Sequence, residues 1–197
     1  MHYFITGATG FIGKRLVKKL LERDGATVHF LTRKQSLDKL NHLLEYWNTD
    51  KTRAIPIVGD LTQPNLGVAK ADLRKLKGKI DHFFHLAAVY DLKAGPEEQQ
   101  EANVNGTRNA VSLANELGAK CFHHVSSIAA AGMYEGVFRE DMFEEAENLD
   151  HPYFRTKHDS EAIVRSECAT PWRVYRPAMV VGDSRTGEMD KIDGPYY

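Results

Sequence analysis

A tyrosine and a lysine four residues apart, Tyr153 and Lys157 in the run YFRTK, could together do acid–base chemistry. Residues i and i+4 of a helix share a face, so a helix here places the phenol beside the ammonium group. A phenol has an ordinary pKa of about 10, and a neighbouring cation lowers that pKa by favouring the phenolate. The pair is therefore a candidate proton donor and acceptor near neutral pH, although the YxxxK spacing alone also arises by chance on helix surfaces.

A glycine-rich segment at the start of the chain, TGATGFIG, supplies a second chemical signal. Gly7, Gly10 and Gly13 follow an apolar run and precede an amphipathic one, which indicates a loop between a strand and a helix. Glycines there permit a tight turn, close approach of a pyrophosphate to the backbone, and packing of helix against strand. The helix N-terminus would offer N–H groups to phosphate. Because glycine spacing alone is a weak signal, a strand–helix turn without a ligand is the alternative.

The end of the second expected strand, FLTRK, bears on which dinucleotide fits. NAD sites usually carry an acidic residue here for the ribose hydroxyls, whereas an arginine suits the 2′-phosphate of NADP. Arg33 lies at this position with Lys34 beside it, and a guanidinium group pairs with phosphate and stacks on adenine. The sequence therefore favours NADP(H), with a simple exposed strand-end charge as the alternative.

These residues need elements that bring them together. Short β-rich runs alternate with longer amphipathic runs, which is typical of a parallel sheet covered by helices. We expect strands at residues 2–5, 27–31, 54–58, 82–86, 121–126 and 173–175, and helices at 11–23, 37–47, 71–76, 99–117 and 153–166. Right-handed crossovers then give an α/β fold, a Rossmann-type doubly wound parallel sheet in the order 3-2-1-4-5-6 with helices on both faces.

The whole chain, residues 1–197, is assigned to one NAD(P)-binding Rossmann domain. Little sequence follows the sixth strand, so we expect the chain to be cut off before a C-terminal substrate-binding part. An uncovered substrate side would expose apolar surface, which favours association into a homo-oligomer. The acidic residues 136–152 either border the active site or form a solvated connection.

Composition excludes several classes of function. The 197 residues are 42% hydrophobic and 27% charged with a net charge of −1, so the sequence shows no electrostatic footprint for nucleic acid or an anionic membrane. No apolar run approaches the roughly 20 residues of a transmembrane helix. Neither a secretory signal nor a disulfide pattern is visible, which makes the cytoplasm the expected location.

Histidines in two expected strands raise the question of a metal. His82 and His85 lie in one strand, and His123 and His124 lie in another. Adjacent strand residues point to opposite faces, and no carboxylate or cysteine completes a ligand set. The sequence therefore predicts no metal site.

Several further motifs carry a family resemblance. The glycine loop, the YxxxK pair, VGDL at 58–61, HLAA at 85–88, NVNGT at 103–107, VSS at 125–127 and YRPAMV at 175–180 occur in order along the chain. With them the chain resembles the extended short-chain dehydrogenase/reductases. The resemblance implies that Ser127, Tyr153 and Lys157 are catalytic and that Asn103 anchors a proton-relay water, with Asn105 as the competing candidate.

The same resemblance implies where the cofactor lies. In that family the aspartate of the third motif meets adenine, the fourth motif lines the ribose, and the last flanks nicotinamide. Expected cofactor contacts are Gly7, Thr9, Gly10, Phe11, Ile12, Gly13, Arg33, Asp60, Leu61, Ala87, Ala88, Val89, Tyr153, Lys157, Pro177, Met179 and Val180. An ordinary loop or capping role is the alternative for Asp60.

Longer segments narrow the resemblance. HLAAVYDL, HHVSSIAAAG, FREDMFEEAENLDHPYFRTKH and TGEMDKIDGPYY are similar to the N-terminal reductase domain of bacterial fatty acyl-CoA reductases. This implies an NADPH-dependent reductase whose substrate is a long-chain acyl-CoA or a fatty aldehyde. A sugar-nucleotide epimerase or dehydratase on the same scaffold, and a dinucleotide sensor without enzymatic activity, are the alternatives.

Overall fold

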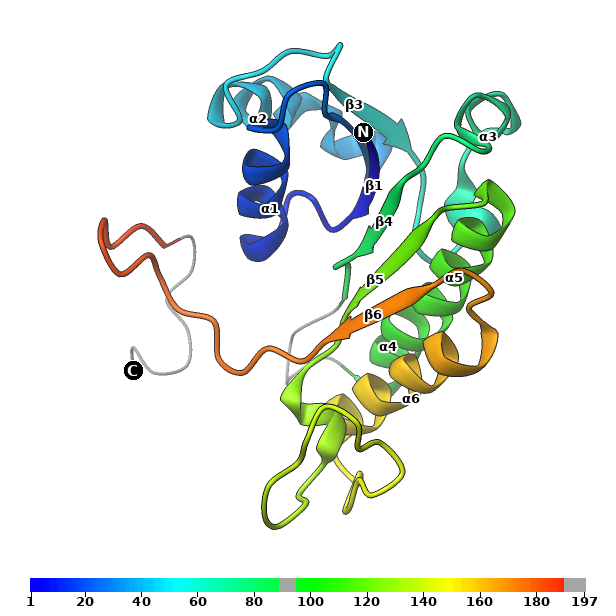
Figure 1. Cartoon of the computed structure of the whole chain (residues 1–197), viewed down its shortest axis with the longest axis vertical. Helices are drawn as coiled ribbons and strands as arrows, with labels where there is room; N and C mark the ends of the chain where they lie inside the picture. Colours follow the sequence, from blue (N-terminus) through cyan, green and yellow to red (C-terminus); the bar gives the residue numbers. More distant parts are fainter. Residues whose placement is uncertain (89–94, 190–197) are drawn as a thin grey trace.

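The alternating runs fold into a six-stranded parallel sheet in this computed structural model, which describes residues 1–88 and 95–189. The strands are β1 (His2–Thr6), β2 (Thr27–Thr32), β3 (Ala54–Val58), β4 (His82–His85), β5 (Cys121–Val125) and β6 (Trp172–Tyr175). Their spatial order is β3-β2-β1-β4-β5-β6, and every neighbouring pair is parallel. The predicted doubly wound order is confirmed (Figure 1).

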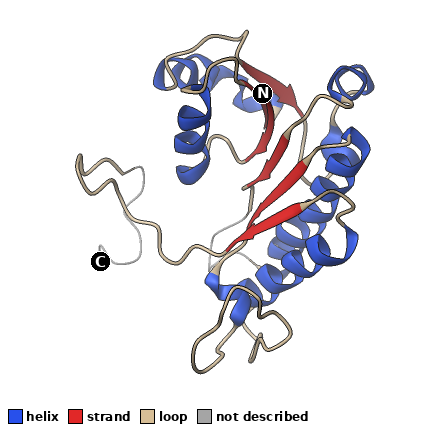
Figure 2. Cartoon of the chain, in the orientation of Figure 1, coloured by secondary structure: helices blue, strands red, loops and turns tan. Residues whose placement is uncertain are grey.

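Helices cover the sheet from both sides (Figure 2). The α-helices are α1 (Phe11–Leu21), α2 (Leu40–Tyr46), α3 (Lys70–Leu76), α4 (Pro96–Gln99), α5 (Gly106–Leu117) and α6 (Pro152–Glu167). Short 3₁₀ helices occur at η1 (Lys34–Lys39), η2 (Pro64–Gly67) and η4 (Ile128–Ala131). No helix of the described residues is both long enough and apolar enough to cross a membrane.

Strand alternation sorts the core into two layers. On one face Phe4, Phe83 and Phe122 from three adjacent strands pack with their ring centroids 4.7 and 5.4 Å apart, under α3, α5 and α6. On the other face Tyr3 and Phe30 pack with residues of α1 and α2. Figure 1 shows α1 and α2 on one side of the sheet, and α3, α5 and α6 on the other.

The predicted helix at 99–117 is wrong in one respect: it is broken. A π-helical turn, η3 (Gln100–Asn105), separates α4 from α5. A π turn holds an extra residue, which rotates the side chains that follow and often marks a functional position. The predicted helix at 37–47 likewise begins as the 3₁₀ turn η1, and only its second part is α-helical.

Candidate active site

The site is built where β1 and β4 lie side by side, which is where the strand order reverses. Ligands of doubly wound sheets bind at the carboxyl ends of the strands at such a reversal. Thr6 at the end of β1 and His85 at the end of β4 join there, with Thr6 Oγ1 2.7 Å from His85 Nδ1. The Ala87 N–H donates to the same Thr6 Oγ1 over 3.2 Å. The two strand ends therefore form one rigid floor.

The glycine loop leaves this floor without room for side chains. Gly7 has φ +74°, and a Cβ there would lie 2.6 Å from the Ala87 backbone nitrogen. A Cβ at Gly13 would overlap the Gly7 carbonyl oxygen. The turn of the loop and the packing of α1 on the strand thus both require glycine, as predicted.

The N-terminus of α1 has the properties of an anion site. Gly10 is its exposed N-cap residue, with extended backbone angles and no side chain to cap the first-turn N–H groups. Orphan N–H groups and the positive end of the helix dipole favour a phosphate. The glycines keep the backbone of this turn free of side chains beside the helix N-terminus, which fits a dinucleotide pyrophosphate. Thr9 and Ile12 are exposed beside it, and Phe11 is half-buried.

The ends of β2 and β3 place a cation near a carboxylate. Arg33 is exposed directly after β2. Asp60 accepts hydrogen bonds from the N–H and the hydroxyl of Thr62, both at 2.9 Å. These bonds, and more weakly the Arg33 charge, hold the pKa of Asp60 below its ordinary value. Asp60 therefore shapes its own turn, and Leu61 beside it packs against Gly106 of α5, where a Cβ would lie 2.7 Å from Leu61 Cγ.

Tyr153 and Lys157 lie on the buried face of α6. Only 7% of Tyr153 and 5% of Lys157 is exposed. The helix begins immediately before them, at Pro152, and the His151 imidazole caps it by accepting from the Tyr153 N–H. Lys157 Nζ donates to the carbonyl oxygen of Val125 at the end of β5 over 3.3 Å. Burial lowers the pKa of Lys157 to about 8.

The two serines after β5 have different surroundings. Ser126 is buried and donates to Glu161 Oε2 of α6 over 3.1 Å. Ser127 is half-buried, and its Oγ caps η4 by accepting from the Ala129 N–H over 3.1 Å. Ser127 is therefore the serine that lies outside the core, next to the strand end that Lys157 contacts.

The π turn resolves which asparagine points inward. Asn103 is buried, and its side-chain amide donates to Thr156 Oγ1 of α6 over 3.4 Å, one residue before Lys157. The backbone carbonyl oxygen of Asn103 accepts a hydrogen bond from the Thr107 hydroxyl. This hydroxyl also lies 3.0 Å from His85 Nε2. Asn105 instead bonds to Glu101 on the outer side. Asn103 thus belongs to the polar layer below the Tyr153–Lys157 pair, and Asn105 does not.

Two neutral histidines complete that polar layer. Burial lowers the pKa of His85 to about 3, with a smaller contribution from the Lys157 charge. Burial likewise holds the pKa of His124 far below its ordinary value, and its Nε2 lies 3.4 Å from Ser160 Oγ of α6. At neutral pH these imidazoles carry no charge, so Lys157 is the cation of this layer.

Glu161 was not among the residues predicted from the sequence. Its carboxylate is fully buried and accepts from Arg165 at 2.9 Å, from Arg176 at 2.6 Å and from Ser126. Burial pushes the pKa of Glu161 up, but the two arginines outweigh burial and hold that pKa below its ordinary value. Glu161 stands four residues after Lys157, so the helix-face argument used for Tyr153 could have found it.

The segment after β6 reaches across the strand ends toward α1 (Figure 1). The Ile128 N–H donates to the Pro177 carbonyl oxygen over 3.2 Å, which holds Pro177 beside η4. Met179 is largely exposed. Val180 lines a groove of about 350 Å³ with Phe11 and Ile12 of α1. The segment therefore joins the glycine-loop side of the site to the α6 side.

The remaining expected cofactor contacts follow β4. Ala87 lies against Gly7, and Ala88 is exposed. Val89 lies outside the described residues.

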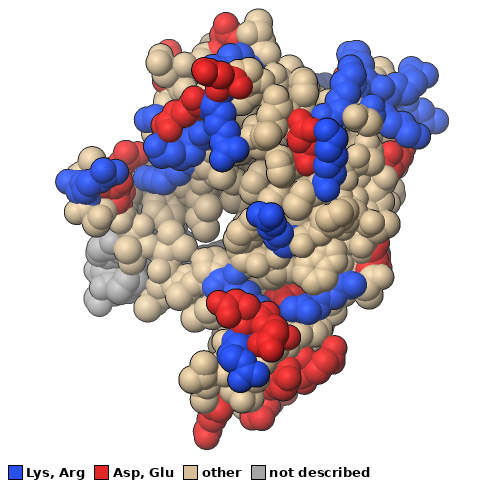
Figure 3. Space-filling model, in the orientation of Figure 1, with Lys and Arg blue, Asp and Glu red and all other residues tan. Residues whose placement is uncertain are grey.

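The acidic connection at 136–152 packs onto α6 and is charged at its surface. The Phe143 ring stacks on His158 of α6 with centroids 4.2 Å apart, and Arg176 donates to the Met142 carbonyl oxygen over 2.8 Å. Figure 3 shows acidic side chains at the lower end of the molecule, where this connection lies in Figure 1. The connection thus packs against the helix that carries Tyr153 and exposes its carboxylates, and its place at the border of the active site stays a prediction.

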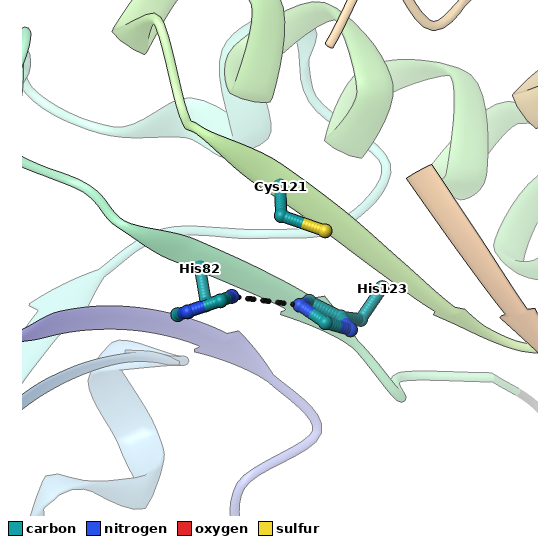
Figure 4. Close-up of side chains that lie close together, drawn as sticks. All are labelled: His82, Cys121 and His123. Carbon is teal, nitrogen blue, oxygen red and sulfur yellow. Dashed lines mark hydrogen bonds between the residues drawn. The ribbon is translucent and has the colours of Figure 1, made fainter. Parts of the chain in front are cut away.

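The premise that no cysteine completes a histidine set is wrong. His82, Cys121 and His123 each bring one ligand atom within 4.8 Å of the others (Figure 4). Parallel register places His82 directly opposite Cys121, and strand alternation puts Cys121 and His123 on one face. The sequence pattern carries no register between these two strands, so the contact was not visible in it.

Comparisons with known proteins agree with this architecture. A family model described as Male sterility protein, an NAD-binding family, matches residues 5–197. A linear gramicidin synthase polypeptide of Brevibacillus parabrevis is 33% identical over 96% of this chain and 4% of that protein. "Aldehyde reductase lnbA" of Aspergillus flavus is 31% identical over 96% and 21%. "Putative fatty acyl-CoA reductase CG8303" of Drosophila melanogaster is 27% identical over 91% and 41%.

Solved structures place the fold among the same relatives. The terminal R domain from the myxalamid PKS-NRPS biosynthetic pathway superposes with a TM-score of 0.81 at 30% identity, over 94% of this chain and 51% of that one. A Bacillus cereus UDP-glucuronic acid 4-epimerase with NAD has a TM-score of 0.71 at 24% identity, over 92% and 58%, which shows the shared fold alone. The chain spans less than half the length of the three curated relatives named above. It belongs to the Male sterility protein family and has the extended short-chain dehydrogenase/reductase fold.

Proposed function

We propose that this domain is an NADPH-dependent reductase of a fatty acyl thioester or a fatty aldehyde, with Tyr153 as the proton donor. The observation that carries the proposal is a cation, Lys157, buried on the same face of α6 as Tyr153 and bonded to the strand end next to Ser127. A buried cation four residues from a phenol favours the phenolate and thereby supports acid–base chemistry, beyond any contact that it makes with the cofactor. Relatives named as aldehyde and fatty acyl-CoA reductases support the substrate class.

The side chains divide the chemistry among them. A bound nicotinamide supplies the hydride that reaches the carbonyl carbon of the substrate. Tyr153 protonates the oxygen on which negative charge develops, and Ser127 orients that oxygen by a hydrogen bond. Lys157 favours the phenolate that remains. With a thioester the product of this step is a hemithioacetal, which expels the thiol and leaves an aldehyde.

Arg33 supports the preference for NADPH over NADH. Its guanidinium group is exposed after β2 and lies close enough to Asp60 to affect that carboxyl group. A guanidinium group suits a 2′-phosphate. Arg33→Ala is expected to weaken NADPH binding and leave NADH binding unchanged, as measured by cofactor fluorescence. Lys34→Ala is the neighbouring control, and equal binding of both cofactors to the wild-type protein would contradict the preference.

The reductase proposal is tested by NADPH oxidation with palmitoyl-CoA, decanal and a nucleotide sugar as alternative substrates. We expect turnover with one or both lipid substrates, and at least a 100-fold loss in Tyr153→Phe, because general acid catalysis contributes about 10²–10⁴-fold. Tyr46→Phe on α2, away from the strand ends, is the matched control. Full turnover in Tyr153→Phe removes the proton-donor role. Epimerisation is redox-neutral, so conversion of the nucleotide sugar is followed by product analysis, and that conversion without net NADPH oxidation indicates the epimerase alternative.

A further inference from the structure

A second cluster of reactive side chains lies on the sheet face opposite α6. His82 begins β4, Cys121 begins β5, and His123 follows two residues later on the same face. Their neighbours Phe122 and His124 point the other way, toward α5 and α6. Figure 4 shows the two imidazoles and the thiol converging from the two strands. This cluster is therefore separate from the site that holds Tyr153 and Lys157.

The spacing of the three donors suits a tetrahedral cation. Zn²⁺ bonds to imidazole nitrogen at about 2.0–2.1 Å and to thiolate sulfur at about 2.3 Å, which separates neighbouring ligand atoms by about 3.5 Å. Here His82 Nδ1 lies 2.9 Å from His123 Nε2, and one ligand atom of each residue lies within 4.8 Å of the others. Small side-chain rotations bring all three donors to bonding distance.

Neighbouring side chains fix the orientation of the His82 and His123 rings. Tyr175 Oη of β6 lies 2.9 Å from His123 Nδ1, and this bond directs His123 Nε2 toward the cluster. Phe84 stacks on the His123 ring with centroids 4.1 Å apart, and Tyr3 stacks on His82 at 5.7 Å. An outer hydrogen bond that fixes the ligating nitrogen is the usual companion of a metal-bound histidine.

A histidine–histidine hydrogen bond alone accounts for only part of the cluster. It explains the contact of His82 with His123, but it does not involve the thiol. The Cys121 Sγ makes only a long contact of 3.9 Å to the Phe122 carbonyl oxygen. A soft sulfur donor beside two imidazoles is the combination that Zn²⁺ and similar metals select.

We propose that His82, Cys121 and His123 form a binding site for Zn²⁺, with a water molecule or another ligand in the fourth position. Cys121 and His82 are only half-buried, so the fourth position is open to solvent. Because the ligands come from neighbouring strands, a bound metal would fasten the beginning of β4 to β5. Binding to the folded protein alone would stabilise it by mass action.

The test uses Co²⁺, whose bond to a thiolate gives a sulfur-to-metal absorption band, followed by Zn²⁺ competition. Chelator-treated protein is expected to bind one metal per chain and to show the band. Cys121→Ser is expected to lose the band, and Cys168→Ser, at the C-cap of α6 and outside the group of three ligands, is expected to keep it. Tyr175→Phe is expected to keep the band and weaken Zn²⁺ binding by about 10–100-fold, the usual effect of losing an outer-shell partner.

Circular dichroism of the metal-free variants separates loss of a ligand from loss of the fold. If Cys121→Ser is unfolded, His82→Gln replaces it, with the exposed His42→Ala on α2 as its control. The proposal is overturned if the wild-type protein binds no stoichiometric metal. It is also overturned if a folded Cys121→Ser keeps the band, if Cys168→Ser loses it, or if His82→Gln and His42→Ala bind Zn²⁺ equally well.

Discussion

The glycine loop and helix α6 approach the same strand ends, but they do so with different parts of the chain. The loop offers backbone: Gly7 and Gly13 lie so close to neighbouring main chain that neither accepts a Cβ. Helix α6 offers side chains: Tyr153, Lys157 and Glu161 are all buried on one of its faces. The loop depends on the absence of a Cβ atom at its glycines, and α6 depends on charged groups buried inside the protein.

This difference predicts different responses to mutation. A substitution in the loop acts by steric overlap, which depends little on pH or salt. A substitution on the inner face of α6 acts through desolvated charge, which depends on the ionisation of each group. Measuring stability as a function of pH can therefore separate the two regions.

The broadest effect, on stability and on cofactor binding together, is expected for Gly7→Ala. Gly7 and Gly78 have almost the same backbone angle, φ +74° and +73°, but a Cβ at Gly78 meets nothing within 4 Å. Gly78→Ala therefore carries only the cost of a left-handed alanine, about 1–2 kcal/mol. Gly7→Ala adds a clash with Ala87, so we expect it to unfold at lower urea concentration than Gly78→Ala and to lose cofactor binding.

The measurement is urea unfolding of both variants together with fluorescence titration of NADPH. Overpacking of a tight contact costs about 1–3 kcal/mol beyond the backbone strain. If the two variants are equally stable and both bind cofactor, a Cβ fits at Gly7, and the steric argument for the loop is wrong.

The next effect is expected for Glu161→Gln, compared with Glu167→Gln on the same helix. Glu161 is buried between Arg165 and Arg176, whereas Glu167 pairs with Arg108 at the surface. Removing one charge from a buried ion pair costs about 3–5 kcal/mol. A surface pair contributes about 0–1 kcal/mol. Equal unfolding midpoints of Glu161→Gln and Glu167→Gln in urea would mean that Arg165 and Arg176 do not depend on the buried Glu161 charge.

The Glu161 comparison also has a pH signature. The folded-state pKa of Glu161 lies below its ordinary value of 4.5. Its stabilising effect is therefore present above that value and disappears as the pH falls through the folded-state pKa. The gap in stability between wild type and Glu161→Gln is expected to narrow in acid, whereas the Gly7→Ala gap is expected to stay constant.

The sequence was sufficient for the frame of the site. Apolar runs separated by amphipathic runs predicted all six strands, and the right-handed crossover rule predicted their order. The i+4 rule placed Tyr153 and Lys157 on one face, and both are buried there. These features depend on local periodicity and on the handedness of crossovers, which a sequence carries directly.

The missed features depend on contacts between distant segments. The apolar spacing of 99–117 remains close to helical, so the extra residue in η3 and the inward turn of Asn103 left no pattern. The helix-face argument places Glu161 on the same side of α6 as Tyr153, but its ion pair with Arg176, which follows β6, joins distant segments and left no pattern in the sequence. The meeting of Cys121 with His82 depends on the register of β4 against β5.

The smallest and most specific effect concerns the Lys157 charge in the protein without cofactor. Burial lowers its pKa from 10.5 to about 8. At pH 7 the ammonium is charged in both states, and holding it in the interior costs about 3 kcal/mol as an upper bound. Between pH 8 and 10.5 the unfolded chain binds the proton that the folded protein has lost, so stability rises with pH in that window.

Lys157→Met removes this charge while keeping most of the side-chain volume. The variant is therefore expected to be inactive as a reductase yet more stable than wild type at pH 7, with the difference shrinking toward pH 10. Exposed Lys34→Met is the control and should show no such trend, because its charge stays in water. Unfolding in urea at pH 7, 8.5 and 10 makes the measurement. A Lys157→Met variant less stable than wild type at pH 7 would mean that the buried ammonium stabilises the fold. The proposed contrast between a loop limited by steric overlap and a helix that buries charge at a cost would then be wrong for Lys157.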